Sequence, residues 1–484
     1  MGFCLRRHWQ KRWLLMATTR LARIATACSL ALPCTLALAA SEPTPTLADY
    51  QKLQERVEQL ERAQSQTEQA LNTERLSEKE PELVTRLKAV EFQTLEMQKQ
   101  ARQIEALEGV TVGASLTSVL QRVMGSGSLP SQGPSRANYR GDVSVSLPGG
   151  QMGDIDGRFF THFRFGQGTG VGLRPTYTST VNSTAFETAA GPDDSFAVLA
   201  QAWYQLNIPL PMGGFKPHSR EHLEINVGKM DPFLFFDQNA AADDETARFM
   251  NNAFVHNPLL DSGGDVGVDA YGFSPGARLA YVNEFSKGQS WSASIGVFGS
   301  GPSSNFSGSL GKPFVIAQID TSRKLITGLA GNYRLYVWQN GRANDFDGLP
   351  TTHRGWGLSV DQRVDEDWTV FGRMGRQNSG LVRFDRTLTL GVQTNGNRWG
   401  RSSDELGLAW GSLHTSSAYR QASADTTVAG YAATGAERSA ELYYRYKLND
   451  RVQLSPNCQW IWRAGADSSA NTIKAIGFRM KVGF

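Results

Sequence analysis

Apolar residues recur with two different periods along the chain, and the period changes near residue 109. Between residues 50 and 108 they follow steps of three and four, which place them on one face of a helix. From Gly109 onward they occupy every second position, which places them on one face of a β-strand. The first set comprises Leu53, Val57, Leu60, Gln64, Thr67 and Leu71, and after Pro81 it continues as Leu87, Val90, Thr94, Met97, Ala101 and Ile104. The chain therefore divides into a helical segment and a β region.

The helical segment has the heptad spacing and charged flanks of a coiled coil. Its apolar face is narrow and includes the polar residues Gln64 and Thr94, so one helix alone has little surface to bury. We interpret residues 41–108 as a coiled coil through which copies of the chain associate, interrupted near Pro81. A single amphipathic helix lying on another surface is the alternative.

The end of the β region shows the alternation most clearly. Its apolar positions alternate with basic residues and glycines, which gives the strand one oily and one wet face. The apolar set is Ile476, Phe478, Met480, Val482 and Phe484, and the polar set is Gly477, Arg479, Lys481 and Gly483. Similar runs occur at Trp356–Val364, Trp291–Phe298, Ile155–Phe165 and Ala202–Ile208.

Three further features favour a membrane barrel over a water-soluble sandwich. Aromatic residues gather at strand ends, arginine recurs on the polar face, and short turns alternate with long polar loops. The short turns are Ser286–Gln289, Asp365–Asp367 and Asn449-Asp450, and the long loops are Gln167–Ser195, Asp231–Pro275 and Ser412–Glu437. A count that places every short turn on one side gives about 16 strands, and barrels of that size leave an aqueous channel. We therefore predict an all-β, antiparallel transmembrane barrel over residues 109–484.

The first 40 residues have the order of a secretory signal peptide. Six basic residues and no acidic ones precede the apolar run Ile24–Ala40, which closes with Ala37-Leu38-Ala39. A membrane anchor is the alternative, but Pro33 breaks the run, which is shorter than the ~20 residues of a spanning helix. The expected location is the outer membrane of a Gram-negative bacterium, with the coiled coil in the periplasm.

Charge and composition exclude several functions. The net charge of +3 becomes about −3 once the six basic residues of the signal peptide leave (3 − 6), so nothing points to nucleic acid. Of four cysteines only Cys458 remains, and His218 and His222 lack the H-E-x-x-H context of a metal site. No nucleophile elbow or phosphate loop occurs. We expect no enzyme activity, no cofactor and no metal.

One long motif resembles a known family. The stretch Val227–Asn239, with Asp243–Thr246 and Arg248–Phe254 after it, is similar to the pattern of the carbohydrate-selective (OprB-type) porins. Gln201–Gln205 and Glu441–Tyr446 are similar as well, so the resemblance spans about Gly109 to Phe484. It implies a sixteen-stranded barrel that admits small sugars of the monosaccharide type and associates as a homotrimer within outer-membrane lipid.

The resemblance and the alternation together predict which residues line the channel. The loop Asp231–Pro275 is long enough to fold into the lumen and oppose a basic wall, and the polar groups of both suit sugar hydroxyls. The expected lining residues are Arg158, Arg164, Lys229, Asp231, Asp237, Asp243, Asp244, Glu245, Arg248, Arg445 and Arg479. Lys481, Arg373 and Arg334 are further inward candidates by alternation. Each wall arginine can instead be a generic solvated residue, and each loop carboxylate can instead hold the loop in place.

Three other functions stay open on the sequence alone. One is a general or anion-preferring diffusion porin, which lumen arginines would also suit. Another is a structural tether whose coiled coil contacts the cell wall while the barrel serves as an anchor. The third is polysaccharide export, which would need partner proteins.

Overall fold

The computed structural model describes a defined part of the chain. It covers Glu58, Glu61 and Arg62, and then 109–129, 133–185, 195–211, 219–260, 272–301, 308–326 and 328–484. The predicted signal peptide (1–40) and all but three residues of the predicted coiled-coil segment (41–108) lie outside the described residues. Those three are exposed and helical, and Arg62 pairs with Glu58 one turn away at 3.4 Å.

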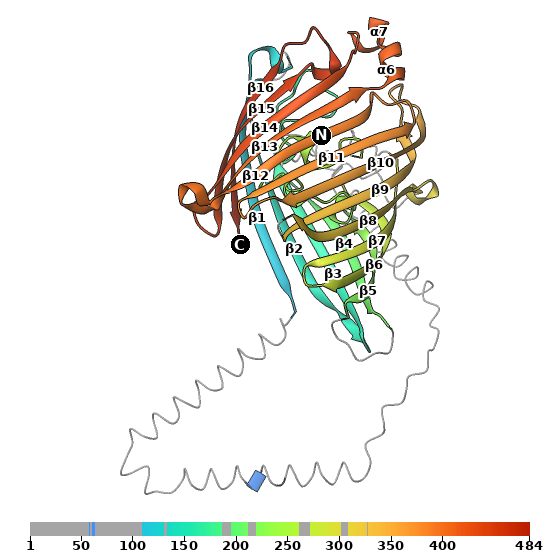
Figure 1. Ribbon diagram of the computed structural model, residues 1–484, viewed down its shortest axis with the longest axis vertical. Coiled ribbons are helices and arrows are strands. Elements are labelled where there is room, and N and C mark those ends of the chain that lie inside the picture. The colour runs from blue at the N-terminus through green and yellow to red at the C-terminus, as the bar shows by residue number, and fades with distance from the viewer. Residues whose placement is uncertain are drawn as a thin grey trace, which may run out of the picture. The chain divides into compact units, whose positions relative to one another are not determined.

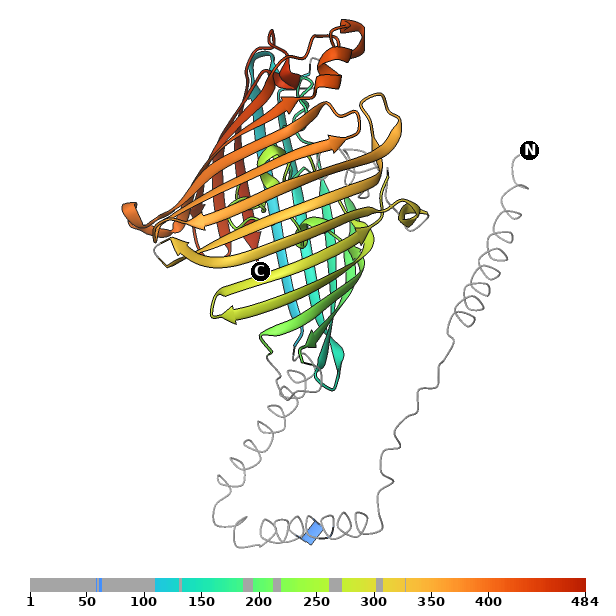
Figure 2. The ribbon, with the colours of Figure 1, turned by 45° about the vertical axis from the view of Figure 1, so that its right-hand side comes forward.

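Sixteen antiparallel strands close into one barrel, because the first strand pairs with the last (Figures 1 and 2). The strands are β1 Thr111–Met124, β2 Ser135–Met152, β3 Ile155–Gln167, β4 Phe196–Pro209, β5 Glu221–Met230, β6 Ser274–Ser286, β7 Gln289–Phe298, β8 Phe314–Ile326, β9 Leu329–Asn344, β10 Pro350–Arg363, β11 Trp368–Ser379, β12 Phe384–Gly396, β13 Arg401–Thr415, β14 Ala436–Lys447, β15 Val452–Trp462 and β16 Ile473–Gly483. The barrel predicted from alternation is confirmed.

The two ends of the barrel differ in the length of their connections. At one end, which we call the short-turn end, most connections are tight, as at 287–288 and 364–367. The opposite, long-loop end carries the segments 168–195, 231–273 and 416–435, although 345–349 and 380–383 are short there too. The strand β1 begins and the strand β16 finishes at the short-turn end, where Phe484 and Ala114 exchange backbone hydrogen bonds.

The strands present different chemistry on their two faces. Large apolar side chains such as Leu120, Leu442 and Ile476 are exposed on the outer face. Polar side chains such as Gln121, Glu441 and Arg479 sit at alternate positions and are buried inside the barrel. A buried charged side chain needs a partner, so the inner wall must be covered by other polar groups.

The helices among the described residues are short. They are α5 Asn252–Val255, α6 Ser417–Ala422 and α7 Thr426–Ala429, with 3₁₀ turns at η1 Gly125–Gly127, η2 Pro232–Leu234, η3 Ser309–Gly311, η4 Asn397–Trp399 and η5 Ala464–Ala466. No described helix has both the length and the apolar composition that crossing a membrane requires.

The segment between β5 and β6 fills one side of the barrel. Within this segment, residues 231–260 carry Phe236, Leu259 and Leu260, which pack with Phe298, Tyr336 and Trp338 of the wall. We call residues 231–260 the infolded loop. Because the loop packs against β7 to β9, open space remains on the side of β1 to β4 and β16.

Candidate functional site

Strand β5, which leads into the infolded loop, contains a glycine whose backbone conformation requires it. Gly228 has a φ of 144°, and a Cβ there would lie 2.3 Å from the carbonyl oxygen of Ala202 on β4. Three residues later Asp231 caps the turn η2, since its carboxylate accepts a hydrogen bond from Phe233 N at 2.9 Å, and Pro232 occupies the first position of that turn. The capped turn at Asp231-Pro232 therefore takes the chain away from the wall directly after Met230, the last paired residue of β5.

The centre of the loop is fixed to the wall by a buried ion pair. Asp237 is fully buried, accepts a hydrogen bond from Tyr336 Oη at 2.7 Å, and contacts Arg373 of β11 at 3.2 Å. Arg373 also donates to the carbonyl oxygens of Asp237 and Phe254, at 3.0 and 2.8 Å. This constellation joins two distant points of the loop to one strand.

Two buried residues of β14 and β16 hold the far part of the loop. Glu441 of β14 accepts hydrogen bonds from the backbone N–H groups of Met250 and Asn251 at 2.8–3.1 Å. Arg479 of β16 donates to the carbonyl oxygens of Glu245 and Arg248 at 2.8 and 2.7 Å. The wall therefore binds mainly the backbone of the loop here, which fixes its path.

A second segment also reaches the inner wall. The sequence predicts an external loop over Gln167–Ser195, but the described residues 168–185 lie against inward side chains. The carbonyl oxygen of Val181 accepts hydrogen bonds from Gln121 and Gln459, and Ser183 N donates to Met250 O at 2.9 Å. Two loops, bonded to each other, thus narrow the lumen.

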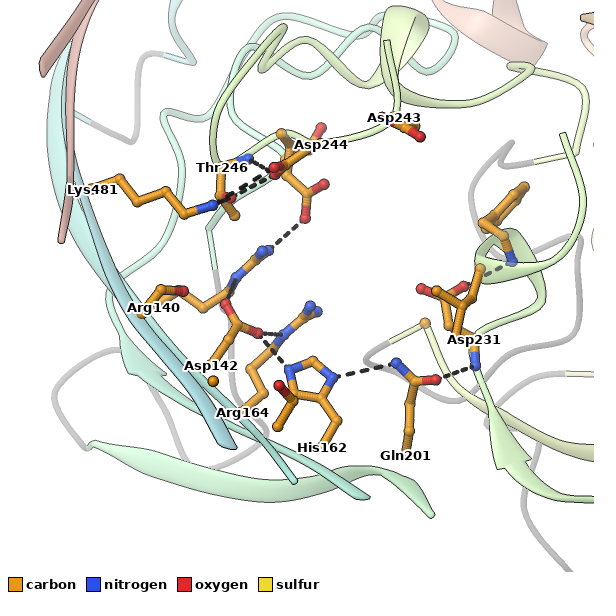
Figure 3. Close-up of a pocket in the computed structure, with 18 of the residues that line it drawn as sticks. Arg140, Asp142, His162, Arg164, Gln201, Asp231, Asp243, Asp244, Thr246 and Lys481 are labelled. Atoms are coloured by element: carbon orange, nitrogen blue, oxygen red, sulfur yellow. Dashed lines mark hydrogen bonds and ion pairs between the residues drawn. The ribbon is translucent and has the colours of Figure 1, made fainter. Parts of the chain in front are cut away.

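The remaining space is a cavity of about 940 Å³. Its walls come from β1, β2, β3, β4 and β16 on one side and from the infolded loop on the other, as Figure 3 shows. Small-molecule sites usually enclose about 300–1,000 Å³. The cavity is therefore large enough for a small polar solute with water.

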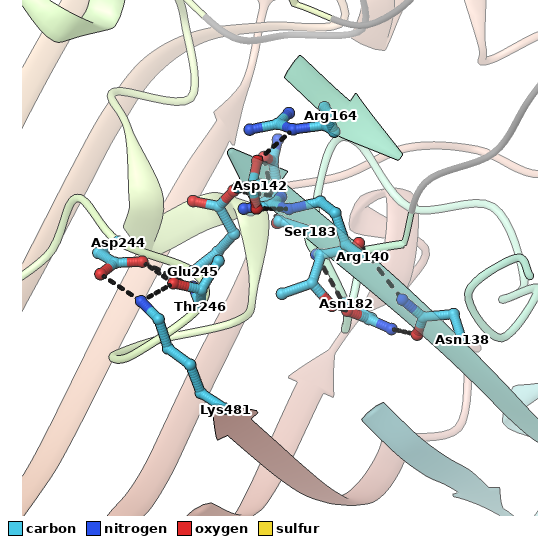
Figure 4. A network of polar contacts seen from close by, with 12 residues as sticks. Asn138, Arg140, Asp142, Arg164, Asn182, Ser183, Asp244, Glu245, Thr246 and Lys481 are labelled. Atoms are coloured by element: carbon cyan, nitrogen blue, oxygen red, sulfur yellow. Dashed lines mark hydrogen bonds and ion pairs between the residues drawn. The ribbon is translucent and has the colours of Figure 1, made fainter. Parts of the chain in front are cut away.

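Charged side chains form a continuous network along the cavity (Figure 4). Lys481 donates to Thr246 Oγ1 at 2.6 Å and pairs with Asp244 at 3.6 Å. The neighbouring Glu245 pairs with Arg140 of β2 at 2.7 Å, and Arg140 pairs in turn with Asp142 at 2.9 Å. Cation and carboxylate thus alternate from the loop to the wall.

The network continues along β3 and β4. Asp142 binds both Arg164 Nε and His162 Nε2 at 2.9 Å, and His162 Nδ1 lies 3.3 Å from Gln201 Nε2. Gln201 Oε1 accepts from the backbone N–H of Asp231 at 3.2 Å, which closes the chain of contacts onto the loop. Within the described residues the terminal amino groups of Arg164 have no hydrogen-bond partner, and Arg164 lines the cavity.

The loop carboxylates differ in their charge. Burial raises the pKa of Asp231 to about 6, against the hydrogen bond from Phe233 N and the attraction of Arg164, which both favour ionisation. Burial also opposes ionisation of Asp244, but Lys481 and the hydrogen bonds from Thr246 outweigh it and lower the pKa of that carboxyl to about 2. Asp244 is thus ionised at neutral pH, whereas Asp231 titrates close to it.

Aromatic rings add flat apolar surface to this cavity. The rings of Phe233 and His256 stack at 3.8 Å, and both residues line the cavity. Phe249 and Phe254 instead pack against Phe371 and Tyr443 of the wall. Phe249 and Phe254 thus pack the loop against the wall, whereas Phe233 faces the lumen.

The predicted lining residues fall into two groups. Arg164, Asp231, Asp243, Asp244 and Glu245 line the cavity together with Lys481. The others do not line it. Asp237, Arg479 and Arg373 are buried anchors, and Arg248 pairs with Asp243 at 2.9 Å without lining the cavity itself. Arg445 pairs with Glu405 and Arg334 with Asp361 on other parts of the inner wall, Arg158 donates to Ser146 Oγ, and Lys229 donates to the carbonyl oxygen of Leu199 on the outward face of the sheet.

Several cavity residues were missed by the sequence analysis. Arg140, Asp142, His162 and Gln201 all lie on inward positions of β2 to β4. The alternation Asn138, Arg140, Asp142, Ser144 is the signal that would have placed the β2 residues inside. Among the described residues, no group of three or more His, Cys, Asp or Glu side chains is arranged to hold a metal ion.

Comparison with known proteins agrees with this geometry. The family model described as carbohydrate-selective porin, OprB family, matches residues 81–484, which begins well before β1 and includes part of the predicted coiled coil. A high-pH structure of Pseudomonas putida OprB is similar at 16% identity and a TM-score of 0.64, with 79% of this chain and 96% of that chain covered. The channel DcaP of Acinetobacter baumannii matches at 12% identity and a TM-score of 0.47, with 78% and 97% covered. No curated protein sequence matches the chain.

Proposed function

This chain belongs to the OprB family of carbohydrate-selective porins, and on that premise we propose that it gives passive diffusion to small sugars of the monosaccharide type. The barrel and the family support an outer-membrane porin, and they point to a channel rather than to an enzyme. The alternation of cations and carboxylates around the cavity is the observation that carries the proposal.

A sugar presents hydroxyl groups that both donate and accept hydrogen bonds. Arg164, through its terminal amino groups, offers donors, and the carboxylates of Asp231 and Asp243 offer acceptors across the cavity. Arginine suits this purpose because its rigid fork presents several donors at once. A channel must replace part of the hydration of a solute without holding it tightly, and separate weak contacts of this kind meet that need.

The balance of charge argues against an anion-preferring channel. The lining includes the carboxylates of Asp142, Asp231, Asp243, Asp244, Glu245 and Asp450, against the basic side chains of Arg140, Arg164, Arg451 and Lys481. Carboxylates outnumber cations, so we expect a modest preference for cations over anions in salt gradients. A reversal potential of the opposite sign would instead favour an anion-preferring porin.

The decisive experiment is liposome swelling with the purified full-length protein. Glucose should enter faster than amino acids of similar size, and Arg164→Gln should reduce this ratio because it removes donors from the cavity. Arg445→Gln is the matched control, since Arg445 is an inner-wall arginine that pairs with Glu405 away from the cavity. Entry that depends on size alone would show a general diffusion porin instead.

We also propose a role for the segment ahead of the barrel. After removal of residues 1–40, residues 41–108 would project into the periplasm as a coiled coil and help three copies associate. Deletion of 41–108 should keep sugar permeability while weakening the trimer in cross-linking experiments. If the deletion instead loosens the envelope from the cell wall and permeability was never sugar-selective, the tether is the better description.

A further inference from the structure

The outer face of the barrel carries a row of basic side chains near its long-loop end. We call it the basic arc; it consists of Arg354, Arg376, Arg386, Arg438, Lys474 and Arg122, on strands β10, β11, β12, β14, β16 and β1. All six are exposed, and they alternate with buried inward residues such as Arg373, Glu437 and Ile473. They therefore point away from the lumen.

The arc borders the apolar belt of the barrel directly. Two residues from Arg376 along β11 lies Met374, two from Arg386 along β12 lies Leu388, and both are exposed. The same holds for Leu120 beside Arg122 on β1. An apolar belt of this kind contacts lipid chains, so the arc lies at the depth where lipid headgroups begin.

The members of the arc are close enough to act together. Arg376 and Arg386 lie directly opposite each other on neighbouring strands, and Arg386 lies opposite His414 of β13. In the register of the sheet, Arg438 lies opposite Trp462 of β15, and Lys474 lies opposite Trp460, which is also on β15. Diagonal neighbours on adjacent strands are about 7–8 Å apart, so Arg354, Arg376 and Arg386 form one group and Lys474 and Arg122 another, with Arg438 one strand away from each group.

Within the part of the chain that the structure describes, most charges of the arc have no ionic partner. On these fully described strands the only ion pair of the arc is the one between Arg386 and Asp385, at 3.2 Å. Like charges placed directly opposite each other in a sheet, as Arg376 and Arg386 are, destabilise it. An external anion would remove that cost.

The outward positions on the other side of the barrel, on β6 to β9, differ from the basic arc. At the same end, the outward positions that lie opposite one another on β6 to β9 are Ala277, Val297, Val315 and Gln339, which are neutral. The row of basic side chains is thus densest on β10 to β16 and β1, although Lys229 and Lys312 also lie near the long-loop end on the other side.

We propose that the basic arc binds the phosphate groups of the glycolipid that surrounds the long-loop end of the barrel. The guanidinium forks of the arc match phosphate oxygens in two-pronged hydrogen bonds, while the adjacent apolar belt contacts the acyl chains. A lipid satisfies both surfaces at once, whereas free phosphate satisfies only the cations. This inference depends on the barrel and not on which solute passes through it.

The test compares binding of a fluorescent diphosphorylated glycolipid of the lipid A type to the full-length protein in neutral detergent. Arg376→Gln with Arg386→Gln should weaken binding about twenty-five-fold, at about five-fold for each charge removed. Arg323→Gln with Arg363→Gln is the matched control, because both arginines lie at the short-turn end; it should bind as the unchanged protein does. Arg438→Gln with Lys474→Gln provides an independent second variant of the arc.

Two further readouts separate this binding from a purely structural role. Without the lipid, the Arg376→Gln, Arg386→Gln protein should be at least as resistant to heat as the unchanged protein, since a like-charge contact has been removed. Glucose entry should be unaltered in every variant. Equal binding by arc and control variants, equal binding of the dephosphorylated lipid, or full competition by millimolar inorganic phosphate would each overturn the proposal.

Discussion

The infolded loop has a wall side and a cavity side, and they use charge differently. On the wall side, Asp237 is fully buried against Arg373, and Glu441 holds backbone N–H groups. On the cavity side, Asp244 and Lys481 remain partly exposed and lie 3.6 Å apart. The buried charges fix the position of the loop, and the exposed ones face the solute. A conspicuous buried charge in a channel is thus not evidence of selectivity.

The largest effect should follow from breaking the wall side at Arg373. Arg373→Gln leaves the carboxylate of Asp237 buried without its cation, and such a change typically costs about 3–5 kcal/mol. We expect a lower free energy of unfolding in urea and, because the loop is released from β11, a larger single-channel conductance. The double change Asp237→Asn with Arg373→Gln should recover part of the stability; unchanged conductance in both would mean that the pair does not position the loop.

An intermediate effect should separate two neighbouring carboxylates of β14. Glu441 holds the infolded loop at Met250 and Asn251, whereas Glu437 holds the 168–185 segment at Tyr177 and Ser179. Each Glu→Gln change weakens buried hydrogen bonds and should cost about 1–3 kcal/mol. Because only Glu441 contacts the infolded loop, Glu441→Gln should change conductance more than Glu437→Gln. Equal changes would show that the two loops move as one body.

The smallest effect belongs to the cavity side and depends on pH. The pKa of Asp231 is raised to about 6, so the carboxyl is neutral below that pH and ionised above it. Cation preference, measured as the reversal potential in a salt gradient, should therefore increase between about pH 5 and 7, and Asp231→Asn should flatten this rise.

The same shift predicts a change in stability of known sign. Between the ordinary carboxyl pKa of 3.8 and about 6, the folded chain binds more protons at Asp231 than the unfolded chain does. Its contribution to stability is therefore present below pH 3.8 and is lost as pH rises through 6. For the reversal potential, a larger pH dependence in Asp231→Asn than in the unchanged protein would contradict the raised pKa of Asp231.

Most of the barrel could be predicted from the sequence because each strand carries its own pattern. The outward apolar row Ile476, Phe478 and Met480 and its inward partner Arg479 follow from alternation within one strand. Alternation carried to the end of β5 would also have put Lys229 on the face of Val227, outside the lumen. These assignments need only local information.

The division of roles among the charges could not be predicted in the same way. Arg140 meets Glu245, and Arg373 meets Asp237, only after the loop has crossed the lumen, and no periodic pattern links positions so far apart in the chain. For the same reason the entry of residues 168–185 into the barrel was missed. Whether a residue stands at an odd or an even position of its strand tells which face its side chain occupies. Contacts across the lumen decide whether that side chain contacts water or protein.

The pairing of β1 with β16 has a consequence for how the molecule is made. Ser115 of β1 lies opposite Gly483 of β16, so the barrel can close only after the last strand has been made. Until then both β1 and β15 present unpaired edges, which are prone to wrong association. Joining such distant segments also carries a high cost in chain entropy, which makes closure a slow step. The final dozen residues therefore govern whether assembly reaches completion, and shortening them should trap an open, aggregation-prone sheet.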